Sequence, residues 1–148
     1  MAKLFPVVAF AVLLITGCGP PATNRFPHGL IQETSAPWDG AATELMLAEN
    51  PLKDRELKVP RLSLQIYQHL SALSKQRVKL DGKESRKGIG QWIAGDGTSQ
   101  PIAWAVVTFG EVRKGTPVEG TYEVKLADGS RAEGKFRAEW LPGAGRGG

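Results

Sequence analysis

The side chain with the most distinctive chemistry in this chain is a thiol near the N-terminus. Cys18 is the only cysteine among the 148 residues. It directly follows two small residues, Thr16 and Gly17, which come after an apolar run from Leu4 to Ile15. A single cysteine cannot form a disulfide within the chain, so the folded part must rely on its apolar core. The small neighbours favour a covalent modification of this thiol.

The other residues offer little catalytic or metal-binding chemistry. His28 and His69 lie in segments of different character and are too few for a typical zinc site. The sequence has no aspartate-rich calcium loop, no G-x-S-x-G elbow and no S-x-x-K pair. Asp96 and Asp128 each adjoin a glycine, which is typical of turns. We therefore expect no enzymatic activity, no metal and no cofactor.

One segment carries concentrated positive charge. Between residues 75 and 87, six basic residues stand against Asp81 and Glu84, while the whole chain has a formal net charge of +4. Such a cluster could attract an anionic membrane, an acidic protein or an anionic glycan, or could be a solvated hairpin with no ligand. The overall charge is too small to indicate a nucleic-acid partner. The candidate residues for an anionic partner are Lys75, Arg77, Lys79, Lys83, Arg86 and Lys87.

The N-terminal segment has the order of a secretory signal peptide. Lys3 supplies a positive charge, and the apolar run that follows is much shorter than the roughly 20 residues of a membrane-spanning helix. Ile15-Thr16-Gly17-Cys18 resembles the lipobox of bacterial lipoproteins, in which an aliphatic residue and two small residues precede a cysteine. This resemblance covers residues 1–18 only.

The resemblance implies that residues 1–17 are removed and that Cys18 carries a diacylglyceryl thioether and an acylated amino group. Two or more acyl chains anchor a protein stably in a membrane without a spanning segment. Gly19 follows the cysteine, and by analogy with enterobacterial sorting the absence of aspartate there favours the outer membrane, facing the periplasm. We therefore expect a lipid-anchored protein of the cell envelope.

Composition divides the remaining chain into three parts. Residues 18–37 hold four prolines and few aliphatic residues, which predicts an extended tether. Residues 38–142 are long enough for one small domain. The glycine-rich residues 143–148 are expected to be a disordered tail.

The fold predicted for this domain is α+β, with one or two helices packed on an antiparallel sheet of about five strands. Asp39 could cap a helix that ends near Glu49. From residue 62 to residue 75, leucine and isoleucine recur at helical spacing, although residues 61–67 also alternate as in a strand. We expect a helix there and leave the strand as the alternative.

The second half of the domain favours strands. Ile102–Val107 is apolar at successive positions, which predicts a strand covered on both faces. In the last hairpin, a three-residue loop at 127–129 places Val124 opposite Ala132 on one face, whereas a two-residue loop would mix the faces. Gly129 would then adopt the left-handed conformation of a type I turn with a G1 bulge.

These observations favour a non-enzymatic binding or structural module of the envelope. Its partners would be membrane lipid through Cys18 and an envelope protein or anionic polymer. Trp92, Trp104 and Trp140 could stack on sugars if exposed; the last two fall on expected core faces, and Trp92 is the one we expect to be exposed. The alternatives are a small enzyme acting on cell-wall material and an inhibitor of a cell-wall hydrolase.

Overall fold

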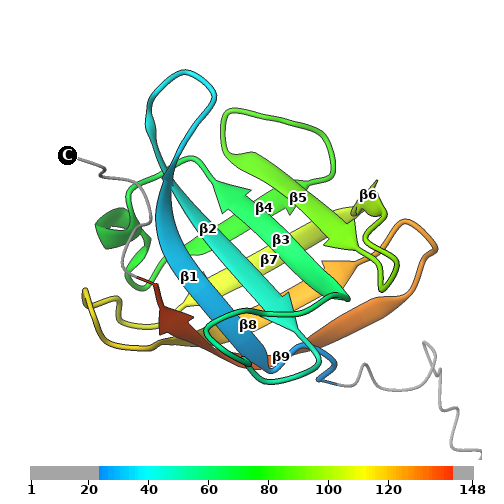
Figure 1. Ribbon diagram of the computed structural model, residues 1–148. Coiled ribbons are helices and arrows are strands. Elements are labelled where there is room, and N and C mark those ends of the chain that lie inside the picture. Colours follow the sequence, from blue (N-terminus) through cyan, green and yellow to red (C-terminus); the bar gives the residue numbers. More distant parts are fainter. Residues whose placement is uncertain (1–23, 142–148) are drawn as a thin grey trace, which may run out of the picture.

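Residues 24–141, the part of the chain that the structure describes, form a single curled β-sheet in the computed structural model (Figure 1). The one helical element in this range is a short 3₁₀ helix, η1 (Leu70–Leu73). The strands are β1 (His28–Ser35), β2 (Ala41–Ala48), β3 (Arg61–Ile66), β4 (Arg77–Asp81), β5 (Gly88–Ile93), β6 (Ser99–Pro101), β7 (Trp104–Phe109), β8 (Val118–Lys125) and β9 (Arg131–Trp140).

The sheet curls into a nearly closed barrel. Its strand order is β4-β7-β8-β9-β1-β2-β3-β5-β6, and every neighbouring pair is antiparallel except β1 and β9. β4, at one edge, contacts β5 near the other edge (Figure 1). The residues after β6 cross this seam, because the Ile102 N–H donates to the Gly90 carbonyl (3.5 Å) and the Ala103 N–H to the Lys125 carbonyl (2.9 Å). Closure in this way leaves few unpaired strand edges.

One apolar cluster fills the interior of the barrel. Leu62, Leu64 and Ile66 of β3 alternate with partly exposed polar residues and are at most 1% exposed. Burying a side chain of this kind contributes about 1.5–3 kcal/mol. A second, smaller cluster lies outside the sheet, where Leu57 of the β2–β3 loop covers outward-facing residues of β1 and β2, namely Leu30, Met46 and Ala48.

The α+β prediction is wrong, because residues 24–141 contain nine strands and no α-helix. The segment expected to continue a helix from Asp39 is β2, and the alternation at residues 61–66 is that of a strand, β3. The helical spacing arose because the chain turns after β3. Leu70 and Leu73 of η1 then pack into the same core as β3. Apolar residues of β3 and η1 therefore have the sequence spacing of a single helical face.

The folded domain also begins earlier than the predicted boundary at residue 38. β1 lies within the expected tether of residues 18–37, yet it pairs with β2 along its full length and with β9. Pro27 precedes the strand and Pro37 lies in the following turn, positions where a missing N–H costs little. The predicted signal peptide, Cys18 and the tail at residues 143–148 lie outside the described residues.

The last hairpin has the predicted register. Val124 pairs with Ala132, and Gly129 adopts a φ of 89° in the turn. The prediction that Ile102–Val107 is covered on both faces is wrong: Ala105 and Val107 are buried, but Ala103 is exposed and Trp104 and Val106 are only half-buried. The outer face of β7 is accessible because no second layer packs over it, which the run of apolar residues did not reveal.

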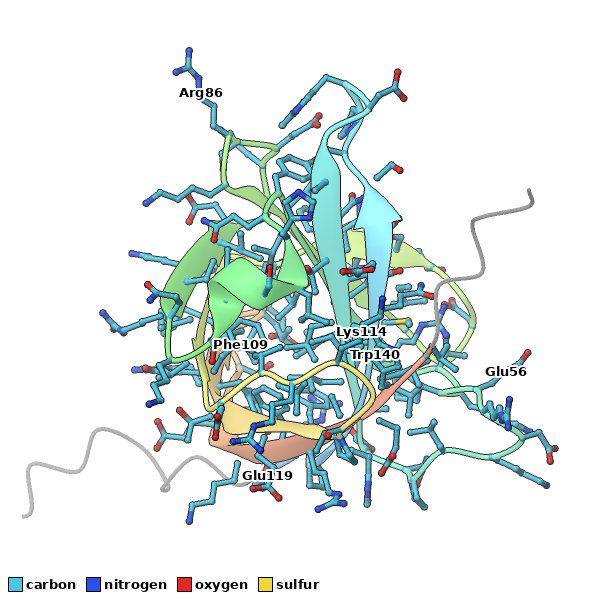
Figure 2. All side chains as sticks on the ribbon, turned by 90° about the vertical axis from the view of Figure 1, so that its left-hand side faces the viewer. Glu56, Arg86, Phe109, Lys114, Glu119 and Trp140 are labelled. Atoms are coloured by element: carbon cyan, nitrogen blue, oxygen red, sulfur yellow. The ribbon has the colours of Figure 1, made fainter. Side chains whose placement is uncertain are left out.

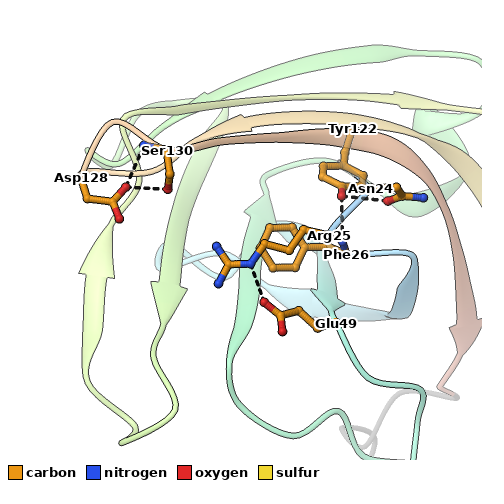
Figure 3. Close-up of polar contacts among 7 residues, drawn as sticks. All are labelled: Asn24, Arg25, Phe26, Glu49, Tyr122, Asp128 and Ser130. Carbon is orange, nitrogen blue, oxygen red and sulfur yellow. Dashed lines mark hydrogen bonds and ion pairs between the residues drawn. The ribbon is translucent and has the colours of Figure 1, made fainter. Parts of the chain in front are cut away.

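The segment before β1 is built into the core. Phe26 is fully buried, and its ring lies 5.5 Å from that of Trp92 and 5.9 Å from that of Tyr122. The Phe26 N–H donates to the Tyr122 hydroxyl (2.8 Å), which donates to Asn24 Oδ1 (2.9 Å) (Figure 3). Burial is the main cause that raises the pKa of Tyr122, so this hydroxyl stays protonated and able to donate. Arg25 pairs with Glu49 and lies over the Phe26 and Trp92 rings.

Replacing Tyr122 with phenylalanine should therefore loosen this segment. The buried Phe26 N–H would lose its acceptor, so we expect Tyr122→Phe to lower the free energy of unfolding by about 1–3 kcal/mol, measured by urea denaturation. The control is Tyr67→Phe, which removes an exposed hydrogen bond to Glu84. We expect it to lower the free energy of unfolding by about 0.5 kcal/mol or less. Equal losses in the two variants would contradict the structural role of Tyr122.

Candidate functional site

The six basic residues of the charged segment, which we call the basic surface, are all exposed. Arg77 and Lys79 project from the outer face of β4, because Val78 and Leu80 alternate inward. Lys75 precedes β4, and three more cations lie in the β4–β5 loop. No salt bridge joins any of the six to another residue within the range 24–141. The basic surface is Lys75, Arg77, Lys79, Lys83, Arg86 and Lys87.

The basic surface is a band and does not converge on one point. Its two ends are separated by β4, whose five residues span roughly 16 Å. The β4–β5 loop lies beside the β1–β2 turn at the upper end of the barrel in Figure 1, and Figure 2 shows Arg86 at that same end. The loop cations thus share one end of the barrel with a second feature.

That feature is an exposed aromatic pair. Trp38, in the β1–β2 turn, is 58% exposed and is the one large apolar side chain exposed within residues 24–141. Its ring lies 4.7 Å from that of Tyr67 in an edge-on arrangement. The Tyr67 hydroxyl donates to Glu84 (2.9 Å), and the Tyr67 N–H donates to the Lys87 carbonyl (3.0 Å). Burial, then the bond to Glu84 and its charge, raise the pKa of Tyr67.

Sequence reasoning missed Trp38 and misplaced two of the three other tryptophans. Trp92 is half-buried against Phe26, which contradicts its expected exposure. Trp104 is half-buried but lies on the outer side of β7, with the Arg131 guanidinium 5.4 Å from its ring. Trp140 packs against the core, as expected. Proline, aspartate and glycine around Trp38 are a usable turn signal in the sequence.

Two hollows on the surface of residues 24–141 do not concentrate reactive groups. The larger, about 540 Å³, lies over the outer face of the sheet and includes Arg77, Glu123, Glu133 and Lys135. Its charges are mixed, and Glu123 pairs with Arg131. Within the described range no three histidine, cysteine, aspartate or glutamate residues lie close enough to hold a metal.

The smaller hollow, about 260 Å³, lies over β2, β3 and β5. Glu44 is its one carboxylate, and this group already accepts hydrogen bonds from Gln32 (2.7 Å) and Ser63 (3.0 Å). His69, the histidine considered as a base, is exposed and precedes η1.

Three hairpin turns of the barrel have the same backbone geometry. In each, the first residue donates its N–H to the fifth residue and accepts from the fourth, which has a positive φ. Two of the turns, 94–98 and 126–130, place glycine fourth, Gly97 and Gly129. Their third residue is aspartate, and its carboxylate accepts the backbone N–H of the fifth residue (2.8 Å in both). Hydrogen bonds from the Thr98 and Ser130 side chains, and then those from their backbone N–H groups, lower the pKa of Asp96 and Asp128.

The turn at residues 36–40 lacks both stabilising features. Its third residue is Trp38, which cannot make the carboxylate bond, and its fourth is Asp39, with a φ of 61°. A residue with a Cβ is strained in this left-handed conformation, although aspartate tolerates it better than most. A Cβ at Gly40 would lie 2.6 Å from Trp38 Nε1, so a larger residue at this position would displace the indole. This turn therefore gives up local stability and holds a tryptophan at its tip.

No protein-family model, no curated protein and no solved structure matches this chain. Among the residues from 24 to 141, no helix has the length and apolarity to cross a membrane.

The different residues at the fourth position of these turns lead to a prediction about stability. Asp39→Gly should raise the free energy of unfolding by about 0.5–1 kcal/mol, because it relieves the left-handed strain. Gly129→Asp places the same residue at the equivalent position of another turn and should lower the free energy of unfolding by a similar amount. Urea denaturation of both variants measures the two changes. A loss of stability in Asp39→Gly would show that the Asp39 side chain supports the fold.

Proposed function

We propose that the protein is a lipid-anchored module of the cell envelope that binds an anionic partner through the basic surface, without catalysis. The observation that carries this proposal is a set of six exposed cations with no salt bridge to any residue in the described range. On β8 and β9, in contrast, two arginines lie beside acids: Arg131 pairs with Glu123, and Arg137 with Glu119. The unpaired cations leave charge available for a ligand.

The lipobox resemblance at Cys18 supports the anchored part of the proposal. The folded part includes Asn24, only six residues beyond Cys18 in the sequence. A fully extended chain of that length spans about 20 Å. An anchor at Cys18 would therefore hold the barrel near the membrane, more tightly than the twenty-residue tether first expected.

The direction of β1 then favours a partner on the side away from the anchor. β1 leads from the N-terminal end of the domain, low in Figure 1, to the Trp38 turn at the opposite end, over about 26 Å. The β4–β5 loop shares this distal end. Attraction of the loop cations to the anchoring membrane is thus the less favoured role, and an envelope protein or anionic polymer is the favoured partner.

Removing the thiol tests the anchor. Cys18→Ser should move the protein from the membrane fraction to the soluble fraction of its native cells, because no thioether can form. Fractionation with immunodetection measures this, and mass spectrometry of the wild-type protein should show an acylated Cys18 as the N-terminal residue. An unmodified thiol, or a serine variant that remains in the membrane, would refute lipid anchoring.

Neutralising the loop cations tests the partner. The triple alanine variant at Lys83, Arg86 and Lys87 should weaken binding to poly-L-glutamate at least tenfold, and wild-type affinity should fall as salt rises. Fluorescence anisotropy with a labelled polymer measures both effects.

The β2–β3 loop offers a matched control, since Lys53, Arg55 and Lys58 are also two lysines and one arginine and are also exposed. Their triple alanine variant has the same net charge as the test variant and should lose affinity less than about twofold. Equal losses from the two variants would mean that overall charge, and not the basic surface, attracts the polymer.

A further inference from the structure

We propose that the turn at residues 36–40 is a saccharide-binding site, and that the anionic partner is a carboxylate-bearing glycan. The charge recognition in this inference rests on the proposed function above. The saccharide recognition rests on separate observations, namely the exposed indole of Trp38, the groups that hold it and the local stability that this turn gives up.

The first argument is the contrast among three turns of one backbone type. Turns 94–98 and 126–130 carry the aspartate and glycine that stabilise this geometry. The turn at 36–40 has Trp38 and Asp39 at those two positions. A local departure from the favoured residues, in a fold that follows them elsewhere, marks a position where another requirement prevails.

The second argument is that Trp38 is exposed and also held. One part of the indole lies against Gly40, where any Cβ would collide with Nε1, and the ring meets Tyr67 edge-on at 4.7 Å. The remaining surface, 58% of the side chain, is open to solvent. A fixed aromatic ring binds with less loss of conformational entropy than a mobile one. Its negative face attracts the weakly positive C–H groups on the apolar face of a sugar ring.

The third argument is the polar surroundings of the indole. Asp39 is adjacent, and Glu84 is bonded to Tyr67, so two carboxylates can accept hydrogen bonds from sugar hydroxyls. Lys83, Arg86 and Lys87 in the same loop region can bind acidic groups on the glycan. A few polar groups around an aromatic surface are typical of a small-molecule site.

A membrane surface fits the turn less well. Tryptophan and basic residues also occur at membrane interfaces. However, the turn lies at the opposite end of β1 from the proposed anchor. This placement favours the glycan.

The test compares two carboxylate polymers, of which one has sugar rings. The mature chain should bind polygalacturonate at least fivefold more tightly than poly-L-glutamate of similar charge. Trp38→Ala should remove this preference and change poly-L-glutamate binding less than twofold. Gly40→Ala, which keeps the tryptophan but displaces it, should also remove the preference.

Asp39→Gly separates binding from folding, because it should stabilise the barrel and yet weaken polygalacturonate binding several-fold. Circular dichroism checks that each variant is folded. Binding of the same proteins to vesicles of phosphatidylglycerol and phosphatidylethanolamine tests the membrane alternative.

The outcomes distinguish the two proposals. No preference for the sugar polymer in the wild type, or equal losses for both polymers in Trp38→Ala, would overturn the saccharide site and leave the proposed anionic partner standing. Failure of the wild type to bind either polymer would overturn both. Vesicle binding that depends on Trp38, with polymer binding unchanged, would replace the glycan with a membrane.

Discussion

The barrel depends on the contact between β1 and β9. These two strands are the one parallel pair of the sheet, and they join the part made of β1, β2, β3, β5 and β6 to the part made of β4, β7, β8 and β9. Parallel pairing is slightly less stable per residue than antiparallel pairing. The preceding segment reinforces the junction, because Phe26 is buried in the core and the Pro27 carbonyl accepts the Arg137 N–H (3.1 Å). The Tyr122 hydroxyl then connects this segment to β8.

Closure around one core determines what the outside of the barrel can do. The interior takes apolar residues from every strand except the short β6, and most charged groups fall on the outer face. On β8 and β9 some of these groups form ion pairs: Arg137 lies opposite Glu119 and pairs with it, and Arg131 pairs diagonally with Glu123. On β4 the cations Arg77 and Lys79 lie opposite Thr108 and Val106 of β7 and have no acid across from them. The difference between the two regions follows from composition, because β8 and β9 contain glutamates and β7 contains no acidic residue.

Local rules predicted the last hairpin well and the first half of the domain poorly. The register of β8 and β9 is fixed by two adjacent strands and a short loop, so the alternation of Val124 and Ala132 sufficed. The 3₁₀ helix η1 and β3 could not be separated in this way, because their leucines meet only through a change of chain direction that no local pattern encodes. β1 was missed because its partners include β9, which lies more than a hundred residues away in the sequence.

The candidate site shows the same limit. The exposure of the six basic residues follows from their charge, whereas the nearby aromatic pair depends on three segments that meet only in the folded chain. The turn at Trp38 is unusual only by comparison with two other turns of the same geometry, and that comparison required their hydrogen bonds and φ values.

The two ends of β1 contribute to the stability of the barrel in opposite ways. At its start, the Phe26 N–H donates to the Tyr122 hydroxyl and the Phe26 ring is buried in the core. Both contacts stabilise the barrel. At its end, the chain accepts a strained Asp39 and exposes an indole, which costs stability. A rigid base and a less stable tip suit a domain that is fixed at one end and meets a partner at the other. β1 pairs with β2 along its full length, and this pairing keeps the Trp38 turn at the opposite end of the strand from Phe26.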